Sequence, residues 1–194
     1  MGLDFHVGLA DEEFHRVATI SRGKGNLGDA AAQRMLKTMM TDAQAMTTRA
    51  FTNPPSIMTS TNKPEWRRMQ QPAANGHGNA RSLAGFYSGL LDGSLLDSEL
   101  LAELTREHSV GEDRTLLTPT RFGLGCMLDQ PTVNNATYGM GPGAFGHPGA
   151  GGTTGFADPE RDVAVGFVTN NLGPFVLMDP RAQKLAVISV SYTH

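Results

Sequence analysis

Cysteine is nearly absent from this sequence, since Cys126 is the only one. A disulfide within the chain is therefore excluded, and because Cys126 lies in an apolar, strand-like stretch we expect a buried, reduced thiol. The chain also has little net charge, with a formal value of −3, and it has no basic run. This charge pattern argues against nucleic acid or a polybasic membrane contact as a partner.

Long apolar runs are missing as well. None is long enough to cross a bilayer, so no transmembrane segment is expected. Residues 1–10 lack the basic start and the long apolar run of a secretory signal peptide. These features leave the compartment open, with the cytoplasm favoured, and they leave the oligomeric state open.

Motifs for metal and phosphate binding are also missing. The six histidines show no paired spacing such as His-x-x-x-His, which argues against a catalytic metal. The glycine-rich run at 139–155 lacks the Gly-Lys-Ser/Thr ending of a phosphate-binding Walker A loop. We therefore expect neither a metal nor a cofactor.

What the sequence does contain is the pattern of one globular domain, with 194 residues of which 39% are hydrophobic. Apolar residues three and four positions apart predict helices over 30–48, about 80–91 and 94–107. Asp29 and Asn79 are suited to cap the first two helices. We expect these helices to form a layer on one side of a sheet.

Two further features, one in a helix and one in a loop, have more than one interpretation. The apolar stripe of the first helix is rich in methionine, which favours core filling over a pliable wall of a binding pocket; its members are Ala32, Met35, Leu36, Met39, Met40, Ala43 and Met46. Trp66, the only tryptophan, is expected to anchor a proline-containing loop rather than to contact a ligand. Asp179 and Pro180 are typical of the cap and first residue of a final helix.

Strand patterns dominate the second half of the chain. They predict strands over 121–128, 144–147, 153–156 and 162–169, the last three adjacent and antiparallel, with a turn at 157–161. The expected fold class is therefore α+β, an antiparallel sheet flanked by helices. Five glycines fall within ten residues of this region, and they indicate either close approach of a backbone or ligand, or a flexible surface loop; they are Gly146, Gly149, Gly151, Gly152 and Gly155.

The stretch His147-Pro148-Gly149 resembles the third motif of the serine β-lactamases, penicillin-binding proteins and family VIII esterases, a class C β-lactamase-like group in which a strand carries Lys-Thr-Gly, His-x-Gly or Trp-x-Gly. Residues 72–87 resemble the family's segment entering a long helix, and 121–126 resemble the strand before the motif. The resemblance runs from Gly2 to about Arg181. It implies a partial β-lactamase/transpeptidase-like fold, with a mainly helical layer at 28–110, sheet strands at 121–171 and a C-terminal helix at 179–194 whose ending is atypical.

The resemblance also implies a site. In the family, the residue after the motif glycine supplies an oxyanion-binding backbone N–H, which here is Ala150, and Gly149 lets the backbone come close. Pro148 has no N–H to donate. His147 could hydrogen-bond a substrate or move protons near neutral pH, or it could merely fill the strand end. Asn75 and His77 lie where the family lines its pocket, and for both residues turn stabilisation is the equal alternative.

The family's nucleophile motif, Ser-x-x-Lys, is not found in its expected setting. The strings at 21–24 and 60–63 do not open an apolar helix and are interpreted as coincidental, and no Tyr-x-Asn occurs. We therefore expect the C-terminal half of a serine hydrolase that cleaves small esters or amides through an acyl-serine, inactive by itself. Esters are favoured because a neutral histidine holds a substrate carboxylate less well than lysine does. The alternative is a non-catalytic binding or structural module.

Overall fold

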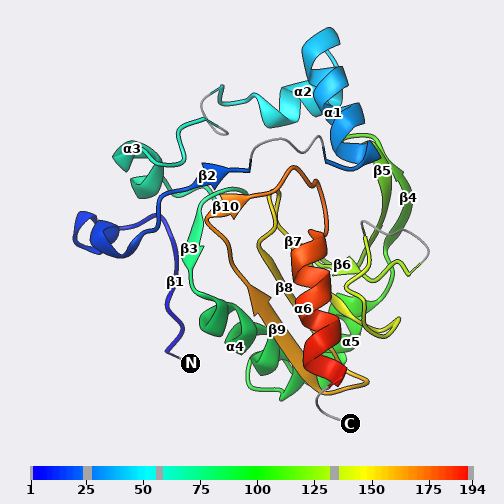
Figure 1. Ribbon diagram of the computed structural model, residues 1–194. Helices are drawn as coiled ribbons and strands as arrows, with labels where there is room; N and C mark the ends of the chain where they lie inside the picture. Colours follow the sequence, from blue (N-terminus) through cyan, green and yellow to red (C-terminus); the bar gives the residue numbers. More distant parts are fainter. Residues whose placement is uncertain (1, 24–27, 56–58, 132–135, 192–194) are drawn as a thin grey trace.

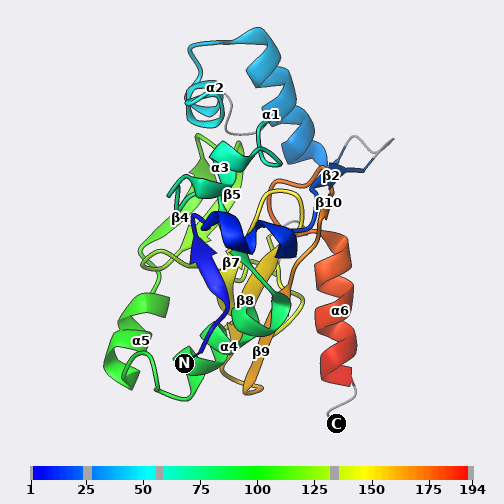
Figure 2. The same ribbon diagram turned by 90° about the vertical axis from the view of Figure 1, so that its left-hand side faces the viewer.

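The computed structural model describes residues 2–23, 28–55, 59–131 and 136–191. Its centre is a six-stranded, fully antiparallel sheet in the order β4-β5-β6-β7-β8-β9, with helices on both faces (Figures 1 and 2). The strands are β4 Ser109–Asp113, β5 Thr118–Phe122, β6 Met127–Leu128, β7 Phe145–Pro148, β8 Thr154–Asp158 and β9 Val163–Phe167. This arrangement confirms the predicted α+β fold class, and it confirms the antiparallel β7-β8-β9 meander.

Two short strand pairs lie outside the main sheet. β1, Phe5–Val7, pairs antiparallel with β3, Gly76–Gly78. β2, Ser21–Arg22, pairs parallel with β10, Asn171–Leu172. Both pairs join segments that are far apart in the sequence.

The prediction of one continuous strand over 121–128 is wrong, because this stretch contains parts of two strands. β5 ends at Phe122, and the chain bends before β6 begins at Met127. The physical reason is a hairpin turn, in which the Gly123 N–H donates to the Cys126 carbonyl oxygen at 2.9 Å and Phe122 pairs antiparallel with Met127. Glycine fits this turn because a β-carbon at position 123 would overlap the carbonyl oxygen of Leu104 in a neighbouring helix.

The helices begin largely where their capping residues predict. They are the 3-10 helix η1 Asp11–Arg16 and the α-helices α1 Ala30–Thr41, α2 Met46–Phe51, α3 Pro64–Arg68, α4 Ala80–Leu91, α5 Ser98–Thr105 and α6 Pro180–Ser191. The Asp29 carboxylate accepts a hydrogen bond from the Ala32 N–H, and the Asn79 side chain accepts one from Ser82. Both predicted caps are thereby confirmed.

The helix predicted over 30–48 is broken, which corrects that prediction. Asp42 adopts an extended conformation, and its side chain accepts hydrogen bonds from the N–H groups of Gln44 and Ala45. A side chain that binds nearby backbone in this way competes with helical hydrogen bonding. The chain therefore leaves α1 at Thr41 and starts again as α2 at Met46.

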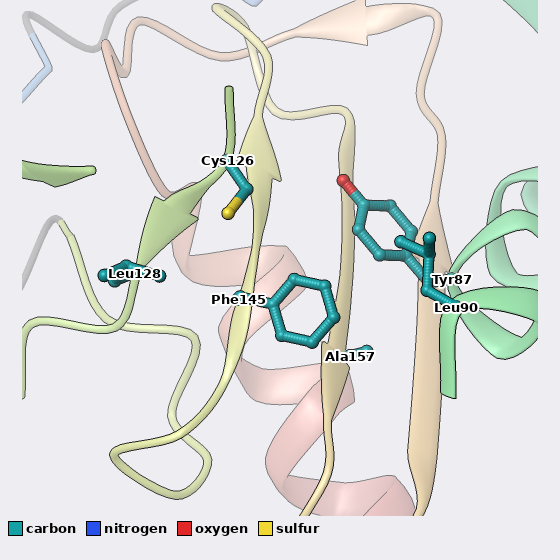
Figure 3. Close-up of a cluster of buried hydrophobic side chains, with 6 residues drawn as sticks. All are labelled: Tyr87, Leu90, Cys126, Leu128, Phe145 and Ala157. Carbon is teal, nitrogen blue, oxygen red and sulfur yellow. The ribbon is translucent and has the colours of Figure 1, made fainter. Parts of the chain in front are cut away.

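The two faces of the sheet carry separate apolar clusters. Phe145 and Ala157, which are cross-strand partners, face α4 and α5, and Figure 3 shows Phe145 in the middle of this cluster. Phe156 belongs to the opposite face, where it packs with Tyr138 and with small residues of α6. This alternation follows from the two-residue period of a strand, and Figure 2 shows α6 on one side of the sheet and α4 with α5 on the other.

The glycine-dense region achieves close packing between a helix and the sheet. Gly155 of β8 and Gly166 of β9 are direct cross-strand partners. A β-carbon on Gly166 would overlap the carbonyl oxygen of Ala80, and one on Gly155 would lie 2.7 Å from Leu83 Cγ. The close approach predicted for Gly155 is therefore made by helix α4, and the same helix also packs on Gly166, which the prediction did not include.

The methionine stripe of α1 and α2 is mostly not core, contrary to the prediction. Met35 is 8% exposed, but Leu36, Met40 and Met46 are 55%, 78% and 56% exposed. The reason is position, because α1 and α2 lie beyond one end of the sheet while α4 and α5 cover its face (Figure 2). Amphipathic spacing predicts an apolar face but not whether the fold places a partner opposite it.

Candidate functional site

The end of strand β7 presents the two residues that the motif singles out. His147 lies two positions after Phe145, so its side chain is on the sheet face that carries α4. The imidazole is exposed, its Nδ1 lies 2.9 Å from the carbonyl oxygen of Pro148, and its ring centre is 6.1 Å from that of Phe122. The structure therefore places an accessible imidazole at the mouth of the β7-β8 connection.

The β7-β8 connection at 149–153 closes on itself through two backbone hydrogen bonds. Gly149 N–H donates to the Thr153 oxygen at 2.6 Å, and Gly152 N–H donates to the Gly149 oxygen at 3.0 Å. Ala150 is exposed, and within the described ranges its N–H has no acceptor. Pro148, by contrast, is buried and has no N–H, so Ala150, rather than Pro148, can offer a free donor next to the motif glycine.

Asn75 occupies a structural position. It is fully buried, its amide nitrogen donates to the carbonyl oxygens of Trp66 and Met69, and its oxygen accepts from Gln71 N–H at 3.0 Å. Both ends of the amide are thus occupied by the main chain. Of the two roles open from the sequence, this geometry favours turn stabilisation.

His77 lies in β3 opposite His6, and its ring meets Trp66 edge-on with ring centres 5.9 Å apart. Burial lowers the pKa of His77 below its ordinary value, and the charge of Arg67 acts in the same direction. The half-buried Trp66 packs on this histidine, as expected for an anchor of the loop.

Two of the surface pockets formed by the described residues can be compared with the predicted site, and neither is lined by His147, Ala150 or Asn75. One, of about 340 Å³, is apolar and lies between α4, α5 and the β5-β6 bend, lined by Phe86, Tyr87, Leu90, Leu95, Leu96, Leu104, Leu124, Gly125, Cys126 and Phe145. The other, of about 660 Å³, lies between α1 and the β4-β5 hairpin, lined by Arg34, Lys37, Thr38, Thr41, Glu112, Asp113, Arg114 and Leu117. The shared cleft predicted for His147, Ala150 and Asn75 therefore stays a prediction.

The lone cysteine is buried and free, as the sequence predicts. Its thiol donates to the Leu104 carbonyl oxygen at 3.3 Å, and burial raises the pKa of Cys126 above its ordinary value. Tyr87 is its neighbour in the cluster of Figure 3. Burial also raises the pKa of Tyr87. Its ring centre lies 6.3 Å from that of Phe145, so this helix residue touches the strand that carries the motif.

Neither of the two Ser-x-x-Lys strings has a serine at the start of a helix. Ser21 lies in strand β2, and Lys24 of that string is outside the described residues. Ser60 lies in a turn, and Lys63 is the residue that precedes α3. A nucleophile activated by a lysine one turn below it needs a helix that these serines do not begin.

Asp179 and Arg181 are two residues near the motif loop whose role the sequence did not reveal. The sequence marks Asp179 as a helix cap, which it is, since its carboxylate accepts from Arg181 N–H at 2.8 Å. It is also fully buried and forms an ion pair with the Arg181 guanidinium at 2.7 Å. No local pattern could have shown that this pair packs against residues 151 and 152, because that contact joins segments about thirty residues apart.

Among the helices in the described ranges, none is both long and apolar enough to cross a membrane. In those ranges there is also no group of three or more histidine, cysteine or acidic side chains arranged to hold a metal ion.

Residues 2–188 match the beta-lactamase family. The chain is 40% identical over 116 residues to the esterase/beta-lactamase LipL of Mycobacterium tuberculosis, a match that covers 56% of this chain and 25% of that protein.

Three solved structures resemble the whole chain. A family VIII carboxylesterase is 28% identical with a TM-score of 0.70, covering 98% of this chain and 47% of that one. A penicillin-binding protein homologue from Caulobacter crescentus is 29% identical with a TM-score of 0.69, covering 97% and 48%. EstA from Arthrobacter nitroguajacolicus Rue61a is 24% identical with a TM-score of 0.77, and the match covers 99% of this chain and 50% of EstA. At this identity the likeness supports the fold alone. The chain spans about half the length of each of these structures, and its match to LipL covers a quarter of that protein. By its sequence match and its fold, the chain belongs to the beta-lactamase family.

Proposed function

We propose that this chain supplies the oxyanion-binding side of a serine hydrolase that cleaves small carboxylic esters. The observation that carries the proposal is the end of β7, where an exposed His147 lies beside an Ala150 N–H that no described group accepts. A backbone donor held ready for developing negative charge is the central requirement of an oxyanion hole.

The proposed chemistry divides its roles between this chain and a nucleophile segment. A serine hydroxyl attacks the ester carbonyl, the oxygen of the tetrahedral intermediate accepts from Ala150 N–H, and the alcohol leaves to give an acyl-serine that water then hydrolyses. His147 hydrogen-bonds the substrate or passes a proton near neutral pH. The serine with its lysine, and the tyrosine of Tyr-x-Asn, are proposed to come from a segment that precedes this one in the parent protein.

The names of the relatives support an ester substrate. LipL is described as an esterase/beta-lactamase, and one of the similar structures is a family VIII carboxylesterase. The motif strand points the same way, because His147 stands where a lysine would hold a substrate carboxylate as a fixed charge. Weak β-lactam hydrolysis is a secondary expectation.

A non-catalytic binding or structural module is the second candidate. It is favoured by one observation, that neither Ser21 nor Ser60 begins a helix. In such a module the end of β7 would still bind a carbonyl or carboxylate group but would not cleave it.

Turnover of p-nitrophenyl esters and nitrocefin tests the two candidates. We expect purified residues 1–194 to hydrolyse neither, and we expect ester hydrolysis from a protein extended at its N-terminus by a segment with Ser-x-x-Lys and Tyr-x-Asn. His147→Ala in that active protein should lower kcat/KM by about 10- to 100-fold. His15→Ala, on the exposed helix η1, is the matched control and should leave the rate unchanged.

Two results would count against the proposal. An extended protein with both motifs and no ester hydrolysis would favour the binding module. Hydrolysis by residues 1–194 that is lost on Ser21→Ala or Ser60→Ala would show that the nucleophile lies in this chain after all.

A further inference from the structure

An ion pair between a buried carboxylate, Asp179, and a partly exposed guanidinium, Arg181, lies directly behind the β7-β8 connection. The carboxylate of Asp179 is fully buried, and it accepts from Arg181 at Nε (3.0 Å) and Nη2 (2.7 Å) as a two-pronged pair. The guanidinium also donates from Nη1 to the Asn171 carbonyl oxygen at 3.0 Å. A paired carboxylate and guanidinium of this kind is a rigid unit, because breaking it leaves a buried charge uncompensated.

The connection packs tightly onto this pair. Arg181 Nη2 donates to the Gly151 carbonyl oxygen at 3.4 Å. A β-carbon on Gly152, where φ is +123°, would lie 2.8 Å from Asp179 Oδ2 and 3.1 Å from Arg181 Nη2. Gly173 packs against the same two atoms. A β-carbon on Gly173 would lie 2.6 Å from Asp179 Oδ2 and 3.1 Å from Arg181 Nη2. The ion pair therefore fills a space that only glycine leaves open.

The peptide between Gly151 and Gly152 is held by these contacts. Its carbonyl oxygen accepts from Arg181 and, at 2.8 Å, from Gly173 N–H. Because a trans peptide points its C=O and N–H in opposite directions, this fixes the direction of the Gly152 N–H. That N–H donates to the Gly149 carbonyl oxygen at 3.0 Å.

The same reasoning extends one peptide further. The Gly149 carbonyl belongs to the peptide that carries the Ala150 N–H. With that oxygen turned toward Gly152, the Ala150 N–H must point the other way, out of the closed loop. This explains why the Ala150 donor is exposed and without an acceptor in the described structure.

We propose that Asp179 and Arg181 are positioning residues that fix the direction of the Ala150 N–H through two consecutive hydrogen-bonded peptides. Burial opposes ionisation of Asp179, but the hydrogen bonds from Arg181 outweigh it and the pKa of the carboxyl lies below its ordinary value, so the pair is charged at neutral pH. The catalytic consequence rests on the proposed function, whereas the effect on the loop does not.

The chain contains a matched control pair. Asp158 is also fully buried and lies 2.7 Å from Arg161 Nη1, but at the other end of β8, in the turn to β9. Asp158→Asn therefore removes the same kind of interaction without touching the β7-β8 connection. Asp179→Asn is the test variant, because asparagine caps a helix as well as aspartate does. Arg181→Lys is a second variant that keeps the charge but loses the planar fork of donors that binds both Asp179 oxygens, the Gly151 carbonyl and the Asn171 carbonyl together.

Amide hydrogen exchange on residues 1–194 decides the effect on the loop. We expect Asp179→Asn and Arg181→Lys each to speed exchange at Gly152, whose N–H donates to Gly149, and at Gly173, whose N–H donates to the Gly151 oxygen, on the order of tenfold or more, as expected for loss of a hydrogen bond to a charged group. Asp158→Asn should leave exchange at both glycines unchanged, whatever it does to the thermal midpoint. Unchanged exchange in the test variants, or equal acceleration in Asp158→Asn, would overturn the inference.

Kinetics in the extended, active protein decide the catalytic consequence. Misdirecting one oxyanion donor should lower kcat by about tenfold to a hundredfold while KM changes little, because the donor binds the transition state more than the ground state. A general loss of structure would instead affect Asp158→Asn equally. Faster exchange at Gly152 without a fall in kcat would keep the loop inference and refute the oxyanion role of Ala150, so the two failures are distinguishable.

Discussion

At the scale of single residues, the hydrogen bonds of a side chain separate structural roles from functional ones. Asn75 has its amide fully used by main-chain groups of the 66–71 loop, whereas His147 bonds only to the neighbouring Pro148 oxygen and keeps an exposed ring. The first arrangement stabilises a turn, and the second leaves a side chain available to a ligand.

The stability of Asn75→Ala tests this distinction. The change leaves the buried carbonyl of Met69 and the N–H of Gln71 without their partner, so we expect the free energy of unfolding to fall by about 2 to 4 kcal/mol in urea titrations. Asn170→Ala, an exposed asparagine that donates to the Thr19 oxygen, should stay within about 0.5 kcal/mol of the original. If the urea midpoint of Asn75→Ala were unchanged, the amide would not be needed to stabilise the turn, and substrate binding would again be the role to test for Asn75.

Only some of these residues could be predicted from the sequence. His147 and Ala150 are found through a motif, since the order His-Pro-Gly-Ala fixes which residue has a donor and which has none. Asp179 is visible only as a cap, because its pairing with Arg181 is local but its contact with Gly152 depends on the fold. The buried state of Asn75 is likewise a property of the folded loop.

At the scale of elements, local chemistry predicted starts and turns better than it predicted continuity. Asp29 and Asn79 cap their helices as expected, because an N-cap needs only its own side chain and the next turn. Two interruptions were not predicted. The break at Asp42 depends on a competing side-chain hydrogen bond, and the hairpin turn at Gly123 depends on the pairing of Phe122 with Met127. The exposure of Met40 was missed because periodicity does not locate a partner.

The packing of α4 on the sheet gives a prediction at this scale. In Gly166→Ala the new methyl group would overlap the Ala80 carbonyl oxygen and lie 2.7 Å from the Ala84 nitrogen, and neither backbone atom can move unless α4 shifts. We expect a loss of about 1 to 3 kcal/mol in the free energy of unfolding. Gly143→Ala, whose nearest neighbour would be Glu160 Oε1 at 3.6 Å, is the control and should be close to neutral. An equal loss of stability in Gly166→Ala and Gly143→Ala would mean that the close packing of α4 on Gly166 does not contribute to stability.

At the scale of the whole molecule, the sheet has two outer strands. β9 hydrogen-bonds to β8 on one side, and in the described structure no other strand pairs with it. Large apolar side chains are also exposed, among them Met40 at 78% and Val168 at 39%. An unpaired strand edge and apolar surface together favour association with other chains.

Association of purified residues 1–194 tests this view. We expect elution from size-exclusion chromatography ahead of the monomer position, with the shift increasing with protein concentration. Val168→Lys, one residue beyond β9, should reduce the shift because a lysine beside an open edge disfavours strand addition. Met40→Lys, on the distant helix α1, is the matched control, and a stronger effect there would assign association to the α1 surface instead.

The small β2-β10 pair has a consequence for the timing of folding. Ser21 and Asn171 are joined across 150 residues of chain. During synthesis at about 5 to 20 residues per second, the β2 segment leaves the ribosome roughly 8 to 30 s before its partner exists. Contacts of such large sequence separation slow folding and leave early segments exposed. Strand β2 therefore stays without its partner until residues 171–172 have been synthesised, whereas β1 can pair with β3 as soon as residues 76–78 are available.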